Sequence, residues 1–273
     1  LTASLRRDAA GAPIHFISAI EDMSDRKQAE FVLEKKTLEL AQTNILVQQR
    51  NQDLDQFAHI VSHDLKAPLR AIANLSTWIE EDLEGQINPE TQTHLDLMRS
   101  RVVRMEAMIN GLLEYARVGN TPASLSTFSF EDLLTEIIDS LSIPPSFEVD
   151  LPTNLPTITT NRMLLSQVFA NLLGNACKHH DRPDGRIQIT AQPQGELWTF
   201  TVIDDGPGIA PENQERVFGV FQTLGARDNQ ENTGIGLSIV KKIVENQGGN
   251  IVVESQLGRG TTFRFSWMKG MSK

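Results

Sequence analysis

The sequence predicts an α+β fold in two successive parts: a helical hairpin that dimerises into a four-helix bundle, and then a two-layer α/β sandwich. Three observations lead to this prediction. Apolar residues recur every seven positions between residues 33 and 61, a second helical repeat runs from 95 to 116, and helix and strand patterns mix after residue 128. A chain of 273 residues is long enough for about two domains, which suits this division.

The composition excludes several classes of protein. The formal net charge of −10 argues against a nucleic-acid surface, which needs a basic field to meet phosphates. No apolar run approaches the ~20 residues of a membrane span, so we expect no membrane segment. Cys177 is the only cysteine, so an internal disulfide and a cysteine-rich metal site are excluded. We expect Cys177 to pack rather than react, and the chain to work in the reducing cytoplasm.

The first residues predict two short strands, Leu1–Arg7 and Ile14–Ile20, separated by the turn-rich segment Asp8–Gly11. Two strands cannot bury a core alone. We therefore expect residues 1–24 to be either the remnant of a larger sheet or a docking piece, and the chain, which opens on Leu1 rather than Met, to be a fragment.

A long helix is predicted after residue 24, with one apolar and one polar stripe that repeat every seven residues. The apolar d positions are Leu33, Leu40, Val47, Leu54 and Val61, and the a positions are Thr37, Asn44, Asn51 and Ala58. So strict a repeat favours a parallel coiled coil between two chains over one amphipathic helix packed on its own chain. We assign residues 25–57 to this coiled coil.

The same register places His63 at position f, farthest from the seam, with Asp64 beside it. The repeat therefore predicts an exposed imidazole next to a carboxylate. A nucleophilic histidine needs one free ring nitrogen and a hydrogen bond on the other, and Asp64 can supply that bond or accept a proton. A solvated histidine on a charged helix face is the ordinary alternative, and this segment alone does not decide between them.

Pro68 is expected to kink the helix, because proline lacks a backbone donor, and the helix is expected to end near Gly85. Pro89 opens a second helix. Its a and d positions are Leu95, Met98, Val102, Met105, Ile109, Leu112 and Ala116. Two such hairpins from two chains predict a four-helix bundle in a homodimer, which we assign to residues 58–119.

After a linker at Gly119–Pro122, a mixed pattern predicts the sandwich over residues 124–270. Helices are expected at Phe130–Leu141, Asn161–His179 and Gly236–Gln247. Strands are expected at Thr157–Thr159, Arg186–Ala191, Trp198–Asp204, Ile251–Glu254 and Thr261–Trp267.

The predicted helix at 161–179 carries polar residues on one face. Asn171 and Asn175 are four residues apart and share that face with Lys178. An amide oxygen is a suitable ligand for Mg²⁺, and an ammonium group is suited to binding phosphate. Alternatively, these three side chains form only the solvent-exposed face of an apolar helix. The adjacent His179 and His180 point about 100° apart, so we do not expect them to form a metal site.

Two glycine segments flank a polar stretch. Asp204 ends an apolar strand and precedes Gly206 and Gly208; its carboxylate can accept a hydrogen bond from an amino group such as that of adenine. Gly234 and Gly236 stand at a predicted helix start, where free N–H groups and the helix dipole favour phosphate. Each segment alone is weak, because Asp-Gly is also a turn and GxG is common. Between them, residues 211–231 predict a mobile lid with apolar anchors Phe218, Val220, Phe221 and Leu224, or else a plain surface loop.

The order and spacing of these motifs resemble the sensor histidine kinases of two-component signalling, over about residues 50–268. His63–Leu69 is similar to the phosphoacceptor box, Asn171–Lys178 to the N box, and Phe218–Phe221 to the F box. Asp204–Ile209 and Gly234–Leu237 are similar to the two glycine boxes. The resemblance implies a dimerising phosphotransfer bundle and a Bergerat-type ATP-binding domain, and residues 1–30 resemble the last strands and exit motif of a PAS sensor domain.

The resemblance also implies residue roles. His63 is the phosphoacceptor and Asp64 its acid/base partner. ATP and Mg²⁺ are the implied cofactors, with Asn175 on Mg²⁺, Asn171 and Lys178 near the phosphates, and Asp204 on the adenine amino group. The residues implied at the lid ends and the phosphate site are Gly206, Gly208, Gly234, Gly236 and Leu237. The phosphoryl group would then pass to an aspartate in the receiver domain of a separate response regulator.

Three positions depart from the family pattern. Ala67 stands where the family often has Thr or Asn to position water for dephosphorylation, so we expect weak phosphatase activity. Asn232 replaces a frequent glycine, which predicts a stiffer lid. Asn161 replaces a frequent aspartate and is expected to cap the following helix.

Two other functions remain open from the sequence: a signalling scaffold that binds nucleotide without transferring phosphate, and another ATPase of the same superfamily, such as a chaperone or a DNA-repair ATPase. The second group lacks the histidine-bearing hairpin, and the acidic charge argues against DNA.

Overall fold

The computed structural model describes residues 2–19, 24–119, 124–152, 155–223 and 233–270. The predicted features at Leu224, Asn232 and residues 120–122 lie outside these ranges. The chain divides into two units, Leu1–Asp53 and Leu54–Lys273, which are considered separately.

In the first unit, strand β1 (Thr2–Arg7) pairs antiparallel with β2 (Pro13–Ala19), close to the two predicted strands. Helix α1 (Ser24–Asp82) begins in this unit. Of its apolar d positions, Leu33, Leu40 and Val47 are exposed in the single chain. Their exposure is what a coiled coil requires before its second chain is added, and the coiled coil stays a prediction.

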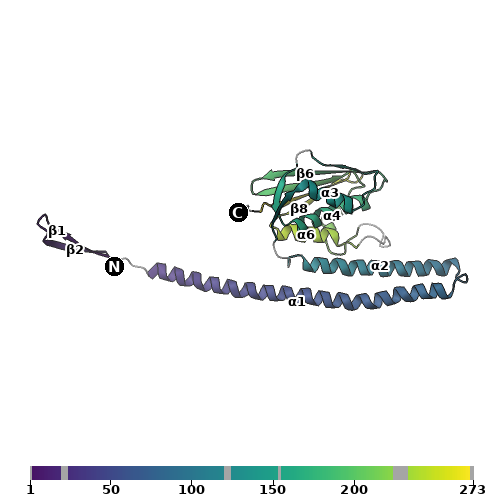
Figure 1. The fold of residues 1–273 in the computed structure, drawn as a ribbon, viewed down its shortest axis with the longest axis horizontal. Helices are drawn as coiled ribbons and strands as arrows, with labels where there is room; N and C mark the ends of the chain where they lie inside the picture. The colour runs from purple at the N-terminus through teal and green to yellow at the C-terminus, as the bar shows by residue number, and fades with distance from the viewer. Residues whose placement is uncertain (1, 20–23, 120–123, 153–154, 224–232, 271–273) are drawn as a thin grey trace. The chain divides into compact units, whose positions relative to one another are not determined.

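In the second unit, α1 continues through Pro68 and forms a hairpin with α2 (Pro89–Arg117), as Figure 1 shows. The Asn88 side chain caps α2 by accepting a hydrogen bond from the Thr91 N–H at 2.7 Å. Leu69, Leu95 and Val102 are buried between the helices. The predicted helical hairpin is therefore confirmed.

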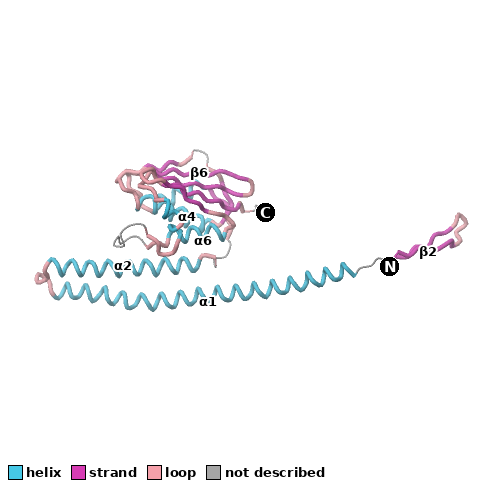
Figure 2. The backbone as a smooth tube through the Cα atoms, turned by 180° about the vertical axis from the view of Figure 1, so that it is seen from behind, coloured by secondary structure: helices cyan, strands magenta, loops and turns pink. Residues whose placement is uncertain are grey.

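The rest of the unit is a two-layer sandwich (Figure 2). A five-stranded sheet runs in the order β4-β6-β7-β9-β8, with β4 and β6 parallel and the other pairs antiparallel. Its strands are β4 (Glu148–Asp150), β6 (Arg186–Gln194), β7 (Leu197–Asp204), β8 (Ile251–Ser255) and β9 (Thr261–Met268). The second layer holds α3 (Phe130–Ser140), α4 (Arg162–Lys178) and α6 (Gly236–Asn246), beside a small pair of β3 (Ser126–Ser129) and β5 (Thr157–Thr160).

An aromatic cluster joins the two layers. The ring of Phe200 on β7 lies 5.0 Å from Phe130 of α3 and 5.5 Å from Phe169 of α4, measured between centroids. The Trp267 indole N–H donates to Thr160 Oγ1 at 2.6 Å, and both residues are buried. Such buried contacts fix α4 against the sheet, which matters because α4 also carries the candidate site.

The structure adds short elements that the sequence analysis missed. β3 and β4 are too short to show a clear alternation, so neither is among the predicted strands. The start of the predicted lid also folds, into α5 (Pro211–Gln214) and a 3₁₀ helix (Arg216–Phe218) with Val217 buried. The Asn161 cap is confirmed, because its Oδ1 accepts from the Leu164 N–H at 3.2 Å.

Candidate functional site

A cavity of about 390 Å³ lies where α4, the start of α6 and the ends of β7 and β9 converge. The predicted residues that line it are Asn171, Asn175, Lys178, Asp204, Gly208, Gly234, Gly236 and Leu237. Gly206 is not in the lining, but its N–H donates to Asp204 Oδ1 at 3.0 Å. The structure therefore brings together residues that are far apart in the sequence.

The polar face of α4 forms one wall. The Asn171 Nδ2 donates to the Gln167 carbonyl oxygen at 2.9 Å, which fixes the amide with its Oδ1 toward α6. A Cβ at Gly236 would lie 2.6 Å from that oxygen, so a larger residue at this position would displace the Asn171 amide. Asn175 and Lys178 line the same cavity. Their placement follows from helix geometry, because the opposite face of α4 is buried in the core.

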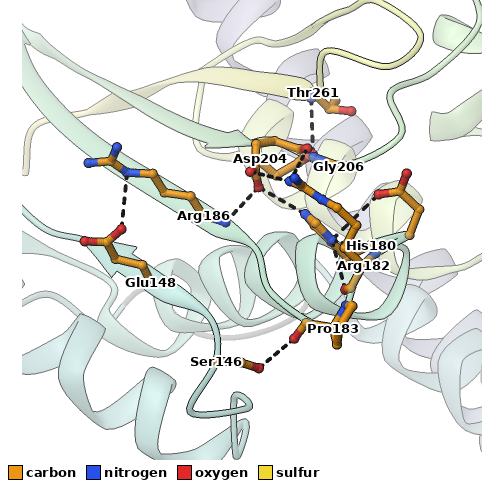
Figure 3. A network of polar contacts seen from close by, with 11 residues as sticks. Ser146, Glu148, His180, Arg182, Pro183, Arg186, Asp204, Gly206 and Thr261 are labelled. Carbon is orange, nitrogen blue, oxygen red and sulfur yellow. Dashed lines mark hydrogen bonds and ion pairs between the residues drawn. The ribbon is translucent and has the colours of Figure 1, made fainter.

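Asp204 forms the other wall, at the end of β7 beside Thr261 of β9. Its Oδ1 accepts from the Gly206 N–H at 3.0 Å and from the Thr261 N–H at 3.2 Å (Figure 3). Burial raises the pKa of the Asp204 carboxyl, while these two N–H bonds act in the opposite direction. Among the described residues, none donates a hydrogen bond to Oδ2, so this oxygen is left as an acceptor.

The turn between β8 and β9 supports the first glycine segment. The Ile209 N–H donates to Ser255 Oγ at 2.7 Å, and the Gly258 N–H donates to the Pro207 carbonyl oxygen at 2.8 Å. A Cβ at Gly208 would lie 2.2 Å from the Gln256 carbonyl oxygen, so the two loops meet backbone to backbone. This contact holds the backbone around Asp204 in place.

Sequence reasoning missed part of this site. Thr261 both lines the cavity and holds Asp204, but the sequence predicts it only as the first residue of the strand Thr261–Trp267. The apolar lining by Ile209, Val217 and Phe263 was also missed. The glycine pair Gly258 and Gly260, which leads directly into this strand, is the sequence signal that points to Thr261. No such signal points to Val217 or Phe263.

A second polar network lies behind Asp204. Asp205 Oδ1 accepts from the Arg186 N–H at 2.7 Å and lies 3.0 Å from His180 Nε2. Its Oδ2 accepts from the Arg182 guanidinium at 2.6 Å. Burial alone would raise the pKa of Asp205, but the contacts with Arg186, His180 and Arg182 together lower it to about 2.

His63 and Asp64 lie on α1 and are not among the residues that line the cavity. The His63 Nδ1 is 3.2 Å from Asp64 Oδ1, and 79% of the His63 side chain is exposed. The exposed imidazole beside a carboxylate that the heptad register predicts is therefore confirmed. A ring held at Nδ1 and open at Nε2 has the form of a nucleophile.

One smaller expectation also fits. Cys177 is half-buried, and burial raises the pKa of its thiol, which suits packing rather than reactivity. Within the described ranges, no group of three or more His, Cys, Asp or Glu side chains could hold a metal ion. The described helices include none that is long and apolar enough to cross a bilayer.

Comparison with known proteins gives matches for both parts of the chain. Residues 160–270 match the family model described as histidine kinase-, DNA gyrase B- and HSP90-like ATPase. Residues 53–121 match the family model of the His Kinase A (phospho-acceptor) domain. Together the two models match more than half of the chain.

Individual proteins match over most of the chain. It is 37% identical over 237 residues to cyanobacterial phytochrome B of Nostoc sp., covering 85% of this chain and 32% of that protein. It is 32% identical over 257 residues to the adaptive-response sensory-kinase SasA of Prochlorococcus marinus, covering 89% of this chain and 66% of that protein. Among solved structures, full-length ShkA in complex with AMPPNP matches with a TM-score of 0.59 and 25% identity, covering 80% of this chain and 47% of that one. The chain thus spans about a third of the first of these relatives.

We predict that Asp205→Asn lowers stability near neutral pH but not in acid. The folded pKa of about 2 lies below the ordinary value of 3.8, so the ionised carboxylate stabilises the fold above about pH 4, and this contribution is lost as the pH falls toward 2. Because the carboxylate is half exposed, solvent limits the effect to about 1 kcal/mol. Urea unfolding of both chains should show similar differences at pH 7 and 5 and a smaller one near pH 3. A difference that does not shrink would contradict this assignment.

Proposed function

Since the chain belongs to the sensor histidine kinases of two-component signalling, we propose that it transfers the γ-phosphoryl group of ATP to His63 and then to an aspartate of a response regulator. One observation carries the proposal. The predicted adenine and phosphate residues line one cavity, and the same chain presents an open, carboxylate-bound imidazole.

The two walls of the cavity suit the two ends of ATP. The Asp204 carboxylate accepts a hydrogen bond from the adenine amino group, and Ile209, Val217 and Phe263 pack around the flat ring. Lys178 and the backbone of Gly234 and Gly236 at the start of α6 hold the phosphates. The match to ShkA, solved in complex with AMPPNP, supports a nucleotide in this place.

The polar face of α4 fits a magnesium ion bound together with the nucleotide. Asn175 lines the cavity with an amide oxygen, which is a ligand that Mg²⁺ accepts, and the phosphates and water complete such a site. When bound, the ion neutralises charge on the phosphates. Asn171, fixed by Gln167, shapes the adjacent wall.

The transfer itself uses His63 and Asp64. In the neutral tautomer, Nδ1–H donates to the Asp64 carboxylate, so the lone pair of Nε2 is available. Nε2 attacks the γ-phosphorus while the bond to the bridging oxygen breaks, and ADP leaves with that electron pair. Little covalent assistance is needed, so the protein contributes mainly positioning and charge neutralisation. The phosphoryl group then moves from Nε2 to a receiver aspartate.

We assign four regions: residues 1–24 as the end of a PAS-like sensor domain, 25–57 as a coiled-coil signalling linker, 58–119 as the dimerisation and phosphotransfer domain, and 124–270 as the ATP-binding domain. A homodimer is supported by the apolar side chains that the single hairpin leaves exposed. These include Leu65, Ile72, Leu75, Ile79, Leu97, Met105 and Leu112. A cytoplasmic location is supported by two features: the proposed reaction needs ATP, and the single cysteine is unpaired.

We predict that His63→Gln abolishes labelling by γ-labelled ATP, whereas His59→Gln does not. His59 is the matched control, because it is also an exposed histidine of α1, one turn earlier. The label should be labile in acid and stable in base, as a phosphoramidate is. A scaffold would bind ATP and take up no label, and an acid-stable label would point to a hydroxyl acceptor; either result contradicts the proposal.

Variants at the two ends of the cavity should behave differently toward Mg²⁺. Asp204→Asn removes a charged acceptor and should weaken ATP binding about tenfold, with Mg²⁺ or with EDTA. Asn175→Ala should weaken binding only when Mg²⁺ is present. Calorimetric titration measures both, and Asp184→Asn is a control at an exposed aspartate outside the cavity. If Asn175→Ala weakened ATP binding equally in EDTA and in Mg²⁺, the proposed role of Asn175 in binding the metal would be wrong.

Ala67 lies one turn after His63 on α1 and is exposed, and its methyl group cannot hold a water molecule. We therefore predict slow dephosphorylation of a regulator that this chain has phosphorylated, and a rate about tenfold faster for Ala67→Thr, because the hydroxyl can position the attacking water. The decay of labelled receiver domain with ADP present measures this. Fast decay with the unchanged chain would contradict the prediction.

A further inference from the structure

His180 lies two residues after the end of α4, next to the capping residue His179, and it is not among the residues that line the cavity. Its side chain is nevertheless only 1% exposed, although its neighbours in the loop are mostly charged. The Phe147 ring packs edge-on against the imidazole with centroids 5.1 Å apart. A polar ring buried this completely must have its hydrogen bonds satisfied by the protein.

The two ring nitrogens have different partners. Nε2 lies 3.0 Å from Asp205 Oδ1, while Nδ1 lies 3.2 Å from the Arg182 N–H and 3.1 Å from the Arg182 carbonyl oxygen. A proton on Nδ1 alone would point the lone pair of Nε2 at a carboxylate, which is repulsive. In the other neutral tautomer, Nδ1 accepts from the Arg182 N–H; in the imidazolium, Nδ1 donates to the carbonyl. In both of these forms, Nε2–H donates to Asp205.

The hydrogen bond between His180 and Asp205 connects His180 to the wall of the cavity that Asp204 forms. Asp205 stands between Asp204 and Gly206, whose N–H holds Asp204 Oδ1. The His180 Cδ2 lies 3.4 Å from the place where a Cβ of Gly206 would be, and Asp204 Oδ1 lies 3.0 Å from that same place. The imidazole, Gly206 and the Asp204 carboxylate are therefore packed in succession. A shift of Asp205 would move the N–H that orients Asp204.

We propose that His180 is a positioning residue for base selection: through Asp205 and Gly206 it fixes the Asp204 carboxylate, so that the cavity selects adenine over guanine. Adenine presents an amino donor where guanine presents a carbonyl oxygen. A fixed carboxylate accepts a hydrogen bond from the adenine amino group and repels the guanine carbonyl oxygen. A mobile carboxylate does neither well, so it discriminates less between the two bases. The proposal rests on the proposed function and specifies how its nucleotide is chosen.

The test compares His180→Asn with His180→Gln in the full chain. The asparagine amide ends where Nδ1 lies, so it can keep the Arg182 contact but cannot reach Asp205; the glutamine amide can place an N–H near the position of Nε2. Titration calorimetry with ATP and with GTP gives both affinities. We expect His180→Asn to bind ATP about tenfold more weakly and to lose about tenfold in its preference for ATP over GTP, with His180→Gln close to the unchanged chain.

Phe147→Leu serves as a control for stability. It loosens the packing on the same ring but leaves both of its hydrogen bonds in place, so it should lower the unfolding temperature without changing the ATP to GTP ratio. An unchanged ratio in His180→Asn, or the same change in Phe147→Leu, would overturn the proposal. If His180→Asn does not fold, Asp205→Asn takes its place with the same expected loss. Failure of the unchanged chain to bind ATP would instead overturn the proposed function.

Discussion

The packing of α4 against the sheet is the constraint on which the rest of the two-layer sandwich depends. One face of the helix buries Leu165, Phe169 and Leu172 in the core, where Phe169 packs against Phe130 of α3 and Phe200 of β7. Helix geometry then leaves Asn171, Asn175 and Lys178 on the faces that line the cavity. The core and the site are thus two sides of one helix. A substitution that rotated α4 by even a fraction of a turn would misplace all three polar groups together.

The features that followed from the sequence are those set by periodicity. The heptad repeat predicted the exposure of His63, and the spacing of Asn171 and Asn175 predicted a shared face, because both depend only on the geometry of one helix. The Asn161 cap followed in the same way. Local chain geometry is encoded by neighbouring residues, so a single sequence is enough to read it.

The features that did not follow are those created by register between distant strands. Thr261 reaches Asp204 because β9 pairs with β7 in a register that places these two residues opposite each other. No residue near Asp204 in the sequence indicates that Thr261 is its partner. The same reason applies to His180, which stands out in the sequence only as half of a histidine pair and whose contact with Asp205 spans 25 residues. Strand pairing fixes which side chains meet, and a single sequence carries little record of it.

The surroundings of His63 and His180 account for the two different roles that we propose for them. Each imidazole contacts an aspartate, at 3.2 Å for His63 and 3.0 Å for His180, so the hydrogen bond does not distinguish them. Exposure does. The His63 ring is exposed and its Nε2 is open to solvent, whereas both nitrogens of His180 have partners and its ring is enclosed. A nucleophile requires a vacant nitrogen and a route to it, while a fixed support requires neither. For the proposed transfer, the predicted coiled-coil register, which places His63 away from the seam, is therefore as necessary as the carboxylate beside the ring.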